Sequence, residues 1–346
     1  MARRTGARAL LVALLVGATT LAACGEDAGG NGDDGAGAGG AATDAVTLSL
    51  DWVPNPDHAG LYYAQENGMF EEADLDVDMQ APSDPAAPLK LVGVNEVDLA
   101  ISYQPELFFA AEEDLPVVAV ASIVPVPLNS LVAPADAGVD SVDDLAGKKV
   151  GSPGLPTSDA FMSTMLEHVG LSLDDVELVN VGYNLLPAML SGRVSAVIGA
   201  YGNVEGIEVE HETHEEPTVI RVDEAGVPTY DELVLVANSR RLESDDAYAD
   251  VVERFIGAMV AGTEGAQDDV DAAVDIMIDV TDYEDEFLRD SVPVTLDLMT
   301  PPGGRRIGCM DAEQWQAFGD WMLDQELIEG EPDASAVMTN DYAGDC

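Results

Sequence analysis

Short apolar runs of the kind that form β-strands alternate with amphipathic helical patterns along most of this 346-residue chain. Such alternation is typical of α/β folds, in which helices cover both faces of a mostly parallel sheet. One series of strand and helix units starts at residue 45, a second series of similar size follows it, and the C-terminal part is mostly helical. The pattern predicts an α/β protein of two lobes, each a sheet flanked by helices.

The spacing of apolar residues indicates where the individual elements lie. Strands are expected at 46–50, 76–80, 97–101, 117–124, 149–151, 176–181, 196–199 and 232–237. Helices are expected at 59–70, 86–94, 105–113, 158–169, 185–191, 250–278, 284–289 and 312–327. Trp315 and Phe318 in the last of these helices are expected to lie in a core.

The chain has to pass twice between the two lobes if its second half returns to the first lobe. We expect these crossings at 128–133 and 233–237, so that lobe I comprises residues 45–128 plus 233–346 and lobe II comprises residues 129–232. Two crossings form a hinge, and the cleft between hinged lobes is a favoured place for a small ligand.

The first residues carry an export signal. Residues 1–23 begin with a basic segment, which an apolar run and a stretch of small residues follow, as in a secretory signal peptide. Leu21–Cys24 matches the bacterial lipobox, which predicts lipidation of Cys24; an ordinary signal with a chance cysteine is the alternative. Residues 24–44 would then form the lipidated cysteine and a glycine-rich flexible tether. We expect a protein anchored by lipid to the extracytoplasmic face of the cell membrane.

The chain is strongly acidic, with 66 Asp and Glu against 14 Lys and Arg. A surface of this sign repels phosphate backbones, which argues against nucleic-acid binding and against adhesion to anionic lipid through a basic face. Because the charges are interleaved with regular apolar runs, general disorder is not expected either. Sparse lysine with abundant acid is similar to proteins of salt-loving organisms, a feature that bears on solubility.

Lipidation of Cys24 would leave Cys309 and Cys346, and an exported chain with two remaining cysteines most simply forms one disulfide. Two free thiols are the alternative. His211 and His214 are three residues apart, a spacing that can hold a metal on a helix, but the run around them is acidic and favours a solvated turn. We expect no metal, no cofactor and no catalytic motif.

Five stretches in the same order along the chain resemble the SsuA/thiamine-pyrimidine family of periplasmic-binding-protein-like chains. They are 50–62, 101–106, 127–131, 147–154 and 199–206. The resemblance covers residues 46 to about 240 and implies a two-lobe periplasmic-binding-protein-like fold. It also implies a monomeric solute-binding subunit of an ABC importer, whose partner is a membrane permease.

The resemblance further implies an amino-pyrimidine precursor of thiamine as ligand, such as formylaminopyrimidine or hydroxymethylpyrimidine. Riboflavin is the alternative, because a related subgroup shares several of these motifs. Some eukaryotic relatives are single-turnover enzymes that make the thiamine pyrimidine, but their cysteine-rich motif is missing here. A structural surface lipoprotein would not require polar and aromatic residues at strand ends. We therefore expect a binding protein and not an enzyme.

Four residues are the main candidates for ligand contact. Trp52 follows the first strand and offers an indole face to a flat ring, with a core position as the alternative. Asn55 offers a donor and an acceptor to the ring edge, with a turn or a helix cap as the alternative. Tyr201 and Glu205 match the Tyr and Glu that contact the pyrimidine in the family. A carboxylate at a helix N-terminus, stabilised by the dipole alone, is the alternative for Glu205.

Further candidates lie at the ends of other strands. His58 contacts the ligand or lies at a helix start beside solvent, while Tyr103 and Gln104 are expected to wall the cleft. Asn129 lies at the first crossing, Ser158 either caps a helix or contacts a polar group of the ligand, and Asn203 accompanies Tyr201. Weaker candidates are Ser130, Thr157, Tyr183 and Asn184.

Overall fold

The computed structural model describes residues 43–83, 87–182 and 184–346. The predicted signal segment, Cys24 and nearly all of the tether lie outside the described residues, as does Tyr183. In the part of the chain that is described, no helix has the length and apolarity needed to cross a bilayer.

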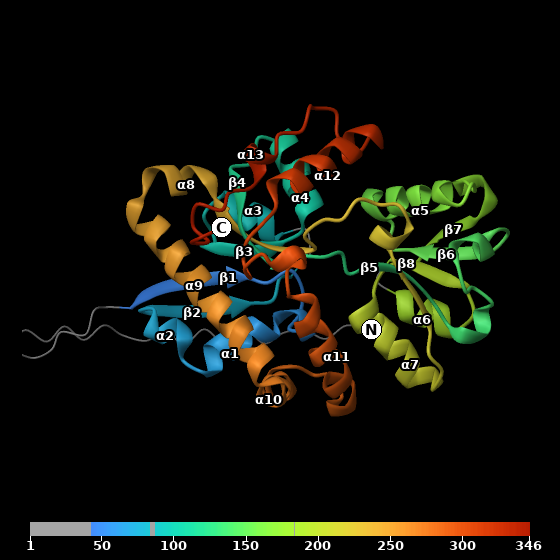
Figure 1. The fold of residues 1–346 in the computed structure, drawn as a ribbon, viewed down its shortest axis with the longest axis horizontal. Coiled ribbons are helices and arrows are strands. Elements are labelled where there is room, and N and C mark those ends of the chain that lie inside the picture. The colour runs from blue at the N-terminus through green and yellow to red at the C-terminus, as the bar shows by residue number, and fades with distance from the viewer. Residues whose placement is uncertain (1–42, 84–86, 183) are drawn as a thin grey trace, which may run out of the picture. The chain divides into compact units, whose positions relative to one another are not determined.

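A five-stranded sheet forms the centre of lobe I, with strand order β2-β1-β3-β10-β4 (Figure 1). Its strands are β1 Asp44–Ser49, β2 Leu75–Gln80, β3 Leu99–Ser102, β4 Val117–Val124 and β10 Leu233–Asn238. The first three are parallel, and β10 runs antiparallel to both β3 and β4. Since β4 and β10 are buried on both faces, their sequences are continuous apolar runs instead of alternating ones. The helices of this part are α1 Ala59–Glu66, α2 Met69–Glu72, α3 Pro88–Gly93 and α4 Gln104–Glu112.

Lobe II contains a second five-stranded sheet, with strand order β7-β6-β8-β5-β9. Its strands are β5 Asn129–Ala133, β6 Lys149–Ser152, β7 Glu177–Asn180, β8 Ala196–Tyr201 and β9 Thr218–Arg221. Here β6 pairs in parallel with β7 and β8, and β5 pairs antiparallel with β8 and β9. Its helices are α5 Pro156–His168, α6 Leu185–Leu190 and α7 Ile207–Thr213. The chain thus forms the two α/β lobes that the alternation predicts.

The C-terminal helices return to lobe I, where α9 packs along α1 (Figure 1). They are α8 Ser239–Ser244, α9 Asp246–Asp268, α10 Val270–Val280, α11 Asp285–Leu298, α12 Ala312–Asp324 and α13 Ala334–Val337. Gly262 makes the α1–α9 contact possible, because a Cβ there would lie 2.5 Å from the Cβ of Ala64. Trp315 and Phe318 on α12 are fully buried, which confirms their expected core position.

A disulfide joins Cys309 to Cys346, with 5.7 Å between the Cα atoms. This is the pairing that the sequence favours over two free thiols. It ties the C-terminal residue to the segment that precedes α12.

Several boundaries differ from the sequence predictions. The expected crossings at 128–133 and 233–237 are wrong, because these segments form β5 and β10, and the chain passes between the lobes just before each strand. The expected helix 250–278 is two helices, since the non-helical backbone of Asp269 ends α9 and its side chain caps α10. The expected helix 284–289 continues to Leu298 in spite of Pro293. Strand β9 was not expected.

Candidate functional site

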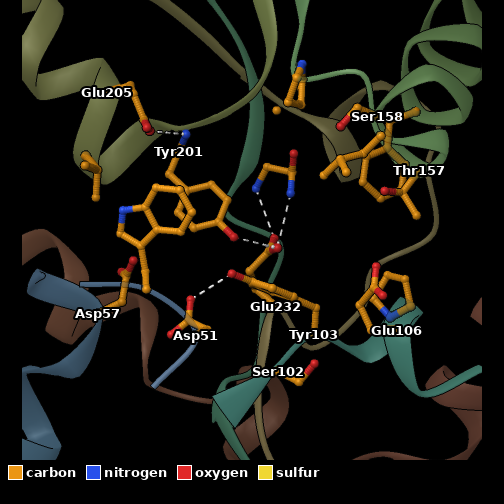
Figure 2. Close-up of a pocket in the computed structure, with 18 of the residues that line it drawn as sticks. Asp51, Asp57, Ser102, Tyr103, Glu106, Thr157, Ser158, Tyr201, Glu205 and Glu232 are labelled. Carbon is orange, nitrogen blue, oxygen red and sulfur yellow. Dashed lines mark hydrogen bonds between the residues drawn. The ribbon is translucent and has the colours of Figure 1, made fainter. Parts of the chain in front are cut away.

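A cavity of about 340 Å³ lies between the two lobes (Figure 2). Its lining comes from Asp51, Trp52, Asn55, Asp57, Leu89, Ser102, Tyr103, Pro105, Glu106, Asn129, Pro153, Leu155, Thr157, Ser158, Phe161, Leu185, Gly199, Tyr201, Val204, Glu205, Tyr230, Glu232 and Tyr283. Many of these follow the carboxyl ends of β1, β3, β6 and β8, where α/β sheets place their ligands. The structure therefore brings together seven of the ten predicted contact residues: Trp52, Asn55, Tyr103, Asn129, Ser158, Tyr201 and Glu205.

The loop after β1 is held in shape by Asn55 and His58. Asn55 caps the 3-10 turn Pro56–His58, as its Oδ1 accepts from the backbone N–H of Asp57 at 2.8 Å. The backbone N–H of Asn55 donates to Nδ1 of His58, so that Nε2 of the same ring carries the hydrogen and donates to Asp51 Oδ1 at 2.8 Å. Asn55 thus has the capping role that was its alternative interpretation, while it also lines the cavity.

Asp51 is an acceptor whose hydrogen bonds lie within lobe I. Its second oxygen accepts from the hydroxyl of Tyr103 at 2.8 Å. Burial by itself raises the pKa of Asp51, but the hydrogen bonds from His58 and Tyr103 outweigh it and hold this pKa below its usual value. Asp51 is therefore an ionised carboxylate that fixes the neighbouring ring of Tyr103 at the wall of the cavity.

Glu232 occupies the hinge and joins both crossings. Its carboxylate accepts five hydrogen bonds, from the backbone N–H groups of Leu128 and Asn129, the Asn129 amide, and the hydroxyls of Tyr201 and Tyr230, at 2.8 to 3.2 Å. A carboxylate has about four lone-pair sites, so Glu232 has no acceptor capacity left for a ligand. Burial raises its pKa, and these hydrogen bonds oppose that rise.

Tyr201 and Glu205 are linked by the shape of the segment that carries them. A bulge in β8 leaves Gly199 unpaired between Ile198 and Ala200, with a φ of +88° that favours glycine. The chain then turns through a π-helical segment, Gly202–Gly206, which returns the Glu205 carboxylate to the backbone N–H of Tyr201 at 2.8 Å. This is the one hydrogen bond that the Glu205 side chain makes in the described residues, so the carboxylate keeps free acceptor sites that face the cavity.

Asp57 and Asn203 connect the two lobes. The Asn203 amide donates to Asp57 Oδ1 at 2.7 Å and to Thr295 Oγ1 on α11 at 2.8 Å, and the Ser291 hydroxyl donates to the Asn203 carbonyl. Burial raises the pKa of Asp57 to about 7, with smaller contributions from His58 and Asn203 that lower it. The lobes are therefore bridged on one side of the cavity by a buried amide and a carboxyl group.

A cluster of aromatic rings bridges the lobes on the other side. Phe161 on α5 stacks on Tyr230 of the second crossing and on Trp321 of α12, with 5.6 Å between ring centroids in each pair. Phe318 packs against both Tyr230 and Trp321. Because α5 belongs to lobe II and α12 to lobe I, these rings bury apolar surface that separation of the lobes would expose.

The charges around the cavity have one sign. Within the described residues the lining includes five carboxyl groups and no Lys or Arg. Those five are Asp51, Asp57, Glu106, Glu205 and Glu232. An anionic ligand would meet uncompensated like charge in this buried space, whereas hydrogen-bond donors and cationic groups would be favoured. The cavity is therefore suited to a donor-rich, uncharged or cationic small molecule.

Three predicted contact residues do not line the cavity. His58 is fully buried under Asp51, so neither ligand contact nor a solvent position describes it. Gln104 is fully buried, and its Oε1 accepts from the backbone N–H of Asp231. Asn203 faces Asp57 and α11, as described above. The capping interpretation of Ser158 is also wrong, because α5 starts after Leu155 and Ser158 makes no cap hydrogen bond.

Of the weaker candidates, Thr157 lines the cavity and Asn184 is exposed and turned back to the Val181 carbonyl. Ser130 bonds the Leu128 carbonyl. His211 pairs with Asp290 on α11, and no group of three metal-ligating side chains occurs in the described ranges.

Sequence reasoning missed the hinge carboxylate Glu232 and the acids Asp51, Asp57 and Glu106. Asp51 and Glu106 stand in the quoted motifs beside Trp52 and Tyr103, so their position after β1 and β3 was a usable signal. Glu232 carried no such signal, because its role depends on the two crossings meeting in space.

We compared the chain with known protein families and with individual proteins of similar sequence. A family model described as "NMT1/THI5 like" matches residues 55–273. A formylaminopyrimidine-binding protein of Halalkalibacterium halodurans is 37% identical over 293 residues, which cover 83% of this chain and 87% of that protein. A 4-amino-5-hydroxymethyl-2-methylpyrimidine phosphate synthase of Aspergillus parasiticus is 25% identical over 315 residues, covering 83% of this chain and 91% of that protein.

Among solved structures, the alkanesulfonate-binding protein SsuA of Xanthomonas axonopodis pv. citri, bound to MOPS, has a TM-score of 0.64 and 15% sequence identity. The match covers 87% of this chain and 99% of that chain. It confirms the two-lobe periplasmic-binding-protein-like fold that the motifs imply. On the family model and the formylaminopyrimidine-binding relative together, the chain belongs to the NMT1/THI5-like family.

Proposed function

We propose that this protein is the solute-binding subunit of an ABC importer and captures an amino-pyrimidine precursor of thiamine. Formylaminopyrimidine and hydroxymethylpyrimidine are the candidate ligands. The observation that carries the proposal is the inter-lobe cavity, in which aromatic rings and carboxyl groups with free acceptor sites line one space without a Lys or Arg among the described residues. An aminopyrimidine offers a flat ring and exocyclic N–H donors, which match both features.

Within this proposal Tyr201 and Trp52 contact the faces of the ring, and Glu205 accepts a hydrogen bond from an N–H group at its edge. Asp57 and Asn55 complete the same end of the cavity. Closure of the lobes buries the ligand, and the bridge between Asp57 and Asn203 is one contact that favours the closed form. A ligand that contacts both lobes shifts the equilibrium towards closure by its differential affinity for that state.

In this proposal the protein binds its ligand and does not catalyse a reaction. The relative of Halalkalibacterium halodurans that supports it is named for binding, whereas the more distant Aspergillus parasiticus relative is named as a synthase. Both cysteines of the described residues, Cys309 and Cys346, are joined in the disulfide. The export signal and lipobox support an extracytoplasmic protein that is anchored through Cys24. In this proposal the closed form of the protein docks on a membrane permease.

Titration calorimetry of the purified protein with formylaminopyrimidine and hydroxymethylpyrimidine tests the proposal. We expect saturable binding of at least one of them, and a loss of about 10-fold or more in affinity for Glu205→Gln, because the neutral amide is a weaker acceptor. Glu210→Gln is the matched control, since Glu210 is exposed on α7 and makes the same change of charge.

Two results would contradict the proposal. One is equal affinity in the Glu205→Gln and Glu210→Gln variants, which would remove Glu205 from the site. The other is a different ligand released from the purified protein and identified by mass spectrometry. A flavin, visible from its absorption, would support the riboflavin alternative instead.

A further inference from the structure

The cavity has a second polar end whose side chains have no hydrogen-bond partner among the residues that the structure describes. It consists of Ser102 at the end of β3, Glu106 on α4, and Thr157 and Ser158 on α5, which we call the α4/α5 cluster. Figure 2 shows Glu106, Thr157 and Ser158 on the side of the cavity away from Glu205 and Asp57. Within the described residues, none of these four side chains is hydrogen-bonded.

Burial makes this lack of partners informative. Ser102 and Ser158 are only 5% and 4% exposed, and buried hydroxyls in proteins are usually hydrogen-bonded. Both hydroxyls face the cavity, so a bound molecule or water has to supply their partners. Because Ser102 and Glu106 come from lobe I and Thr157 and Ser158 from lobe II, a group bound here would contact both lobes.

The surroundings of the α4/α5 cluster restrict the chemistry of that group. Leu89, Pro105, Leu155, Phe161 and Leu185 also line the cavity and offer no polar side-chain atom. The hydroxyls can donate or accept, while an ionised Glu106 only accepts. Burial raises the pKa of Glu106, as expected for a carboxyl group without a cationic partner.

An anion is disfavoured at this position. The N-terminus of α5 carries a partial positive charge that would attract a phosphate, but the Glu106 carboxyl group lines the same cavity and opposes it. No Lys or Arg among the described lining residues compensates the repulsion. A hydroxymethyl or formylamino group has donors for Glu106 and no charge.

We propose that the α4/α5 cluster is a second subsite, which binds an uncharged hydroxyl or amide substituent of the pyrimidine ring and excludes its phosphate ester. The inference rests on the proposed function and adds to it the residues that decide between free and phosphorylated precursors. Glu106 is the residue that determines this selectivity, and Ser158 and Thr157 hold the substituent.

The test compares three ligands by titration calorimetry: hydroxymethylpyrimidine, its phosphate ester, and the analogue in which a methyl group replaces the hydroxymethyl group. We expect the unmodified protein to prefer the free alcohol over the ester by about 100-fold or more, a difference that a single buried like-charge contact can produce. Glu106→Gln should reduce this ratio about 10-fold or more, mainly by tighter binding of the ester. Glu113→Gln, on the same stretch of chain but exposed, should leave the ratio unchanged.

The hydroxyls are tested with the analogue. Ser158→Ala should weaken binding of hydroxymethylpyrimidine about 5-fold or more but leave binding of the methyl analogue nearly unchanged, because only the former has the group that Ser158 contacts. Equal losses for both ligands would assign Ser158 a structural role and overturn its part of the subsite.

The outcomes separate this inference from the proposed function. If the unmodified protein binds the alcohol and the ester equally, or if Glu106→Gln does not alter their ratio, the subsite is overturned while pyrimidine capture stands. If neither these three pyrimidines nor formylaminopyrimidine binds to the unmodified protein, both are overturned.

Discussion

The hinge and the α4/α5 cluster contain similar chemical groups in opposite hydrogen-bonding states. At the hinge, Glu232 accepts five hydrogen bonds from both crossings. In the α4/α5 cluster, Glu106 accepts none within the described residues. A carboxylate whose lone pairs are filled by the protein stabilises the fold, whereas one with free lone pairs is available to a ligand. We therefore expect the number of protein hydrogen bonds to distinguish acids that stabilise the fold from acids that contact the ligand.

Removal of Glu232 should give the largest effect. Glu232→Ala leaves the hydroxyls of Tyr201 and Tyr230 and the backbone donors of the first crossing without their acceptor in a buried place. We expect a loss of about 3–5 kcal/mol in unfolding free energy, measured by urea denaturation. Glu232→Gln keeps part of the hydrogen bonding, so its unfolding free energy should lie between those of Glu232→Ala and the unmodified protein. An unchanged denaturation midpoint in Glu232→Ala would show that the hinge carboxylate does not stabilise the fold.

The next largest effect concerns Asp57 and pH. Its folded pKa of about 7 lies above the ordinary 3.8, so the folded protein binds the extra proton, and stability decreases as the pH rises through the window from about 4 to 7. At about 1.4 kcal/mol per pKa unit the loss over this window is on the order of 4 kcal/mol. Asp57→Asn removes this titration while its Oδ1 can still accept from Asn203, so its stability should depend less on pH.

Thermal denaturation of both proteins between pH 5 and pH 8 measures this difference. The facing groups Asp51, His58 and Glu205 are the same in both proteins, so the comparison isolates residue 57. Parallel pH profiles of the melting temperature would contradict the assignment.

A smaller effect is expected at Asp51, where each carboxylate oxygen accepts one hydrogen bond from a side chain. Tyr103→Phe removes one of its hydrogen bonds, with an expected cost of about 1 kcal/mol in unfolding free energy at neutral pH. The pKa of Asp51 should rise, because the Tyr103 hydroxyl helps to lower it. The stability that Asp51 contributes is present above the pKa of Asp51 in the unfolded chain and is lost as the pH falls. The difference in unfolding free energy between Tyr103→Phe and the unmodified protein should therefore become smaller in acid. A constant difference at all pH values would speak against this coupling.

The smallest effect on stability should be at Glu106. Since Glu106 accepts no hydrogen bond from the described residues, Glu106→Gln should leave the unliganded melting temperature unchanged or raise it slightly near pH 8, where an ionised buried carboxylate is least favourable. Differential scanning calorimetry without ligand checks this. A large destabilisation would mean that Glu106 is a structural acid like Glu232, and the comparison above would fail.

The relation between local sequence and local structure explains what could be predicted. The apolar runs at β4 and β10 and the motifs after β1, β3 and β8 are local signals, and they placed Tyr103, Tyr201 and Glu205 at strand ends. The helix boundaries at Asp269 and Leu298 were harder to predict from the sequence, because a side-chain cap and packing around Pro293 decide them.

The sequence by itself determined the α/β class, the division into two lobes and eight of the 23 residues that line the cavity. Periodic burial and strand-end position depend on neighbours along the chain, which the order of residues states directly. Only the tertiary structure decided that His58 and Asn203 lie outside the cavity lining and hydrogen-bond residues that form it. It also decided that the acceptor sites of Glu232 are filled by protein donors, whereas Glu106 accepts no hydrogen bond from the described residues. Those distinctions depend on groups up to 146 residues apart, as in the bond from Asn203 to Asp57, and no local pattern records which distant donors reach a carboxylate.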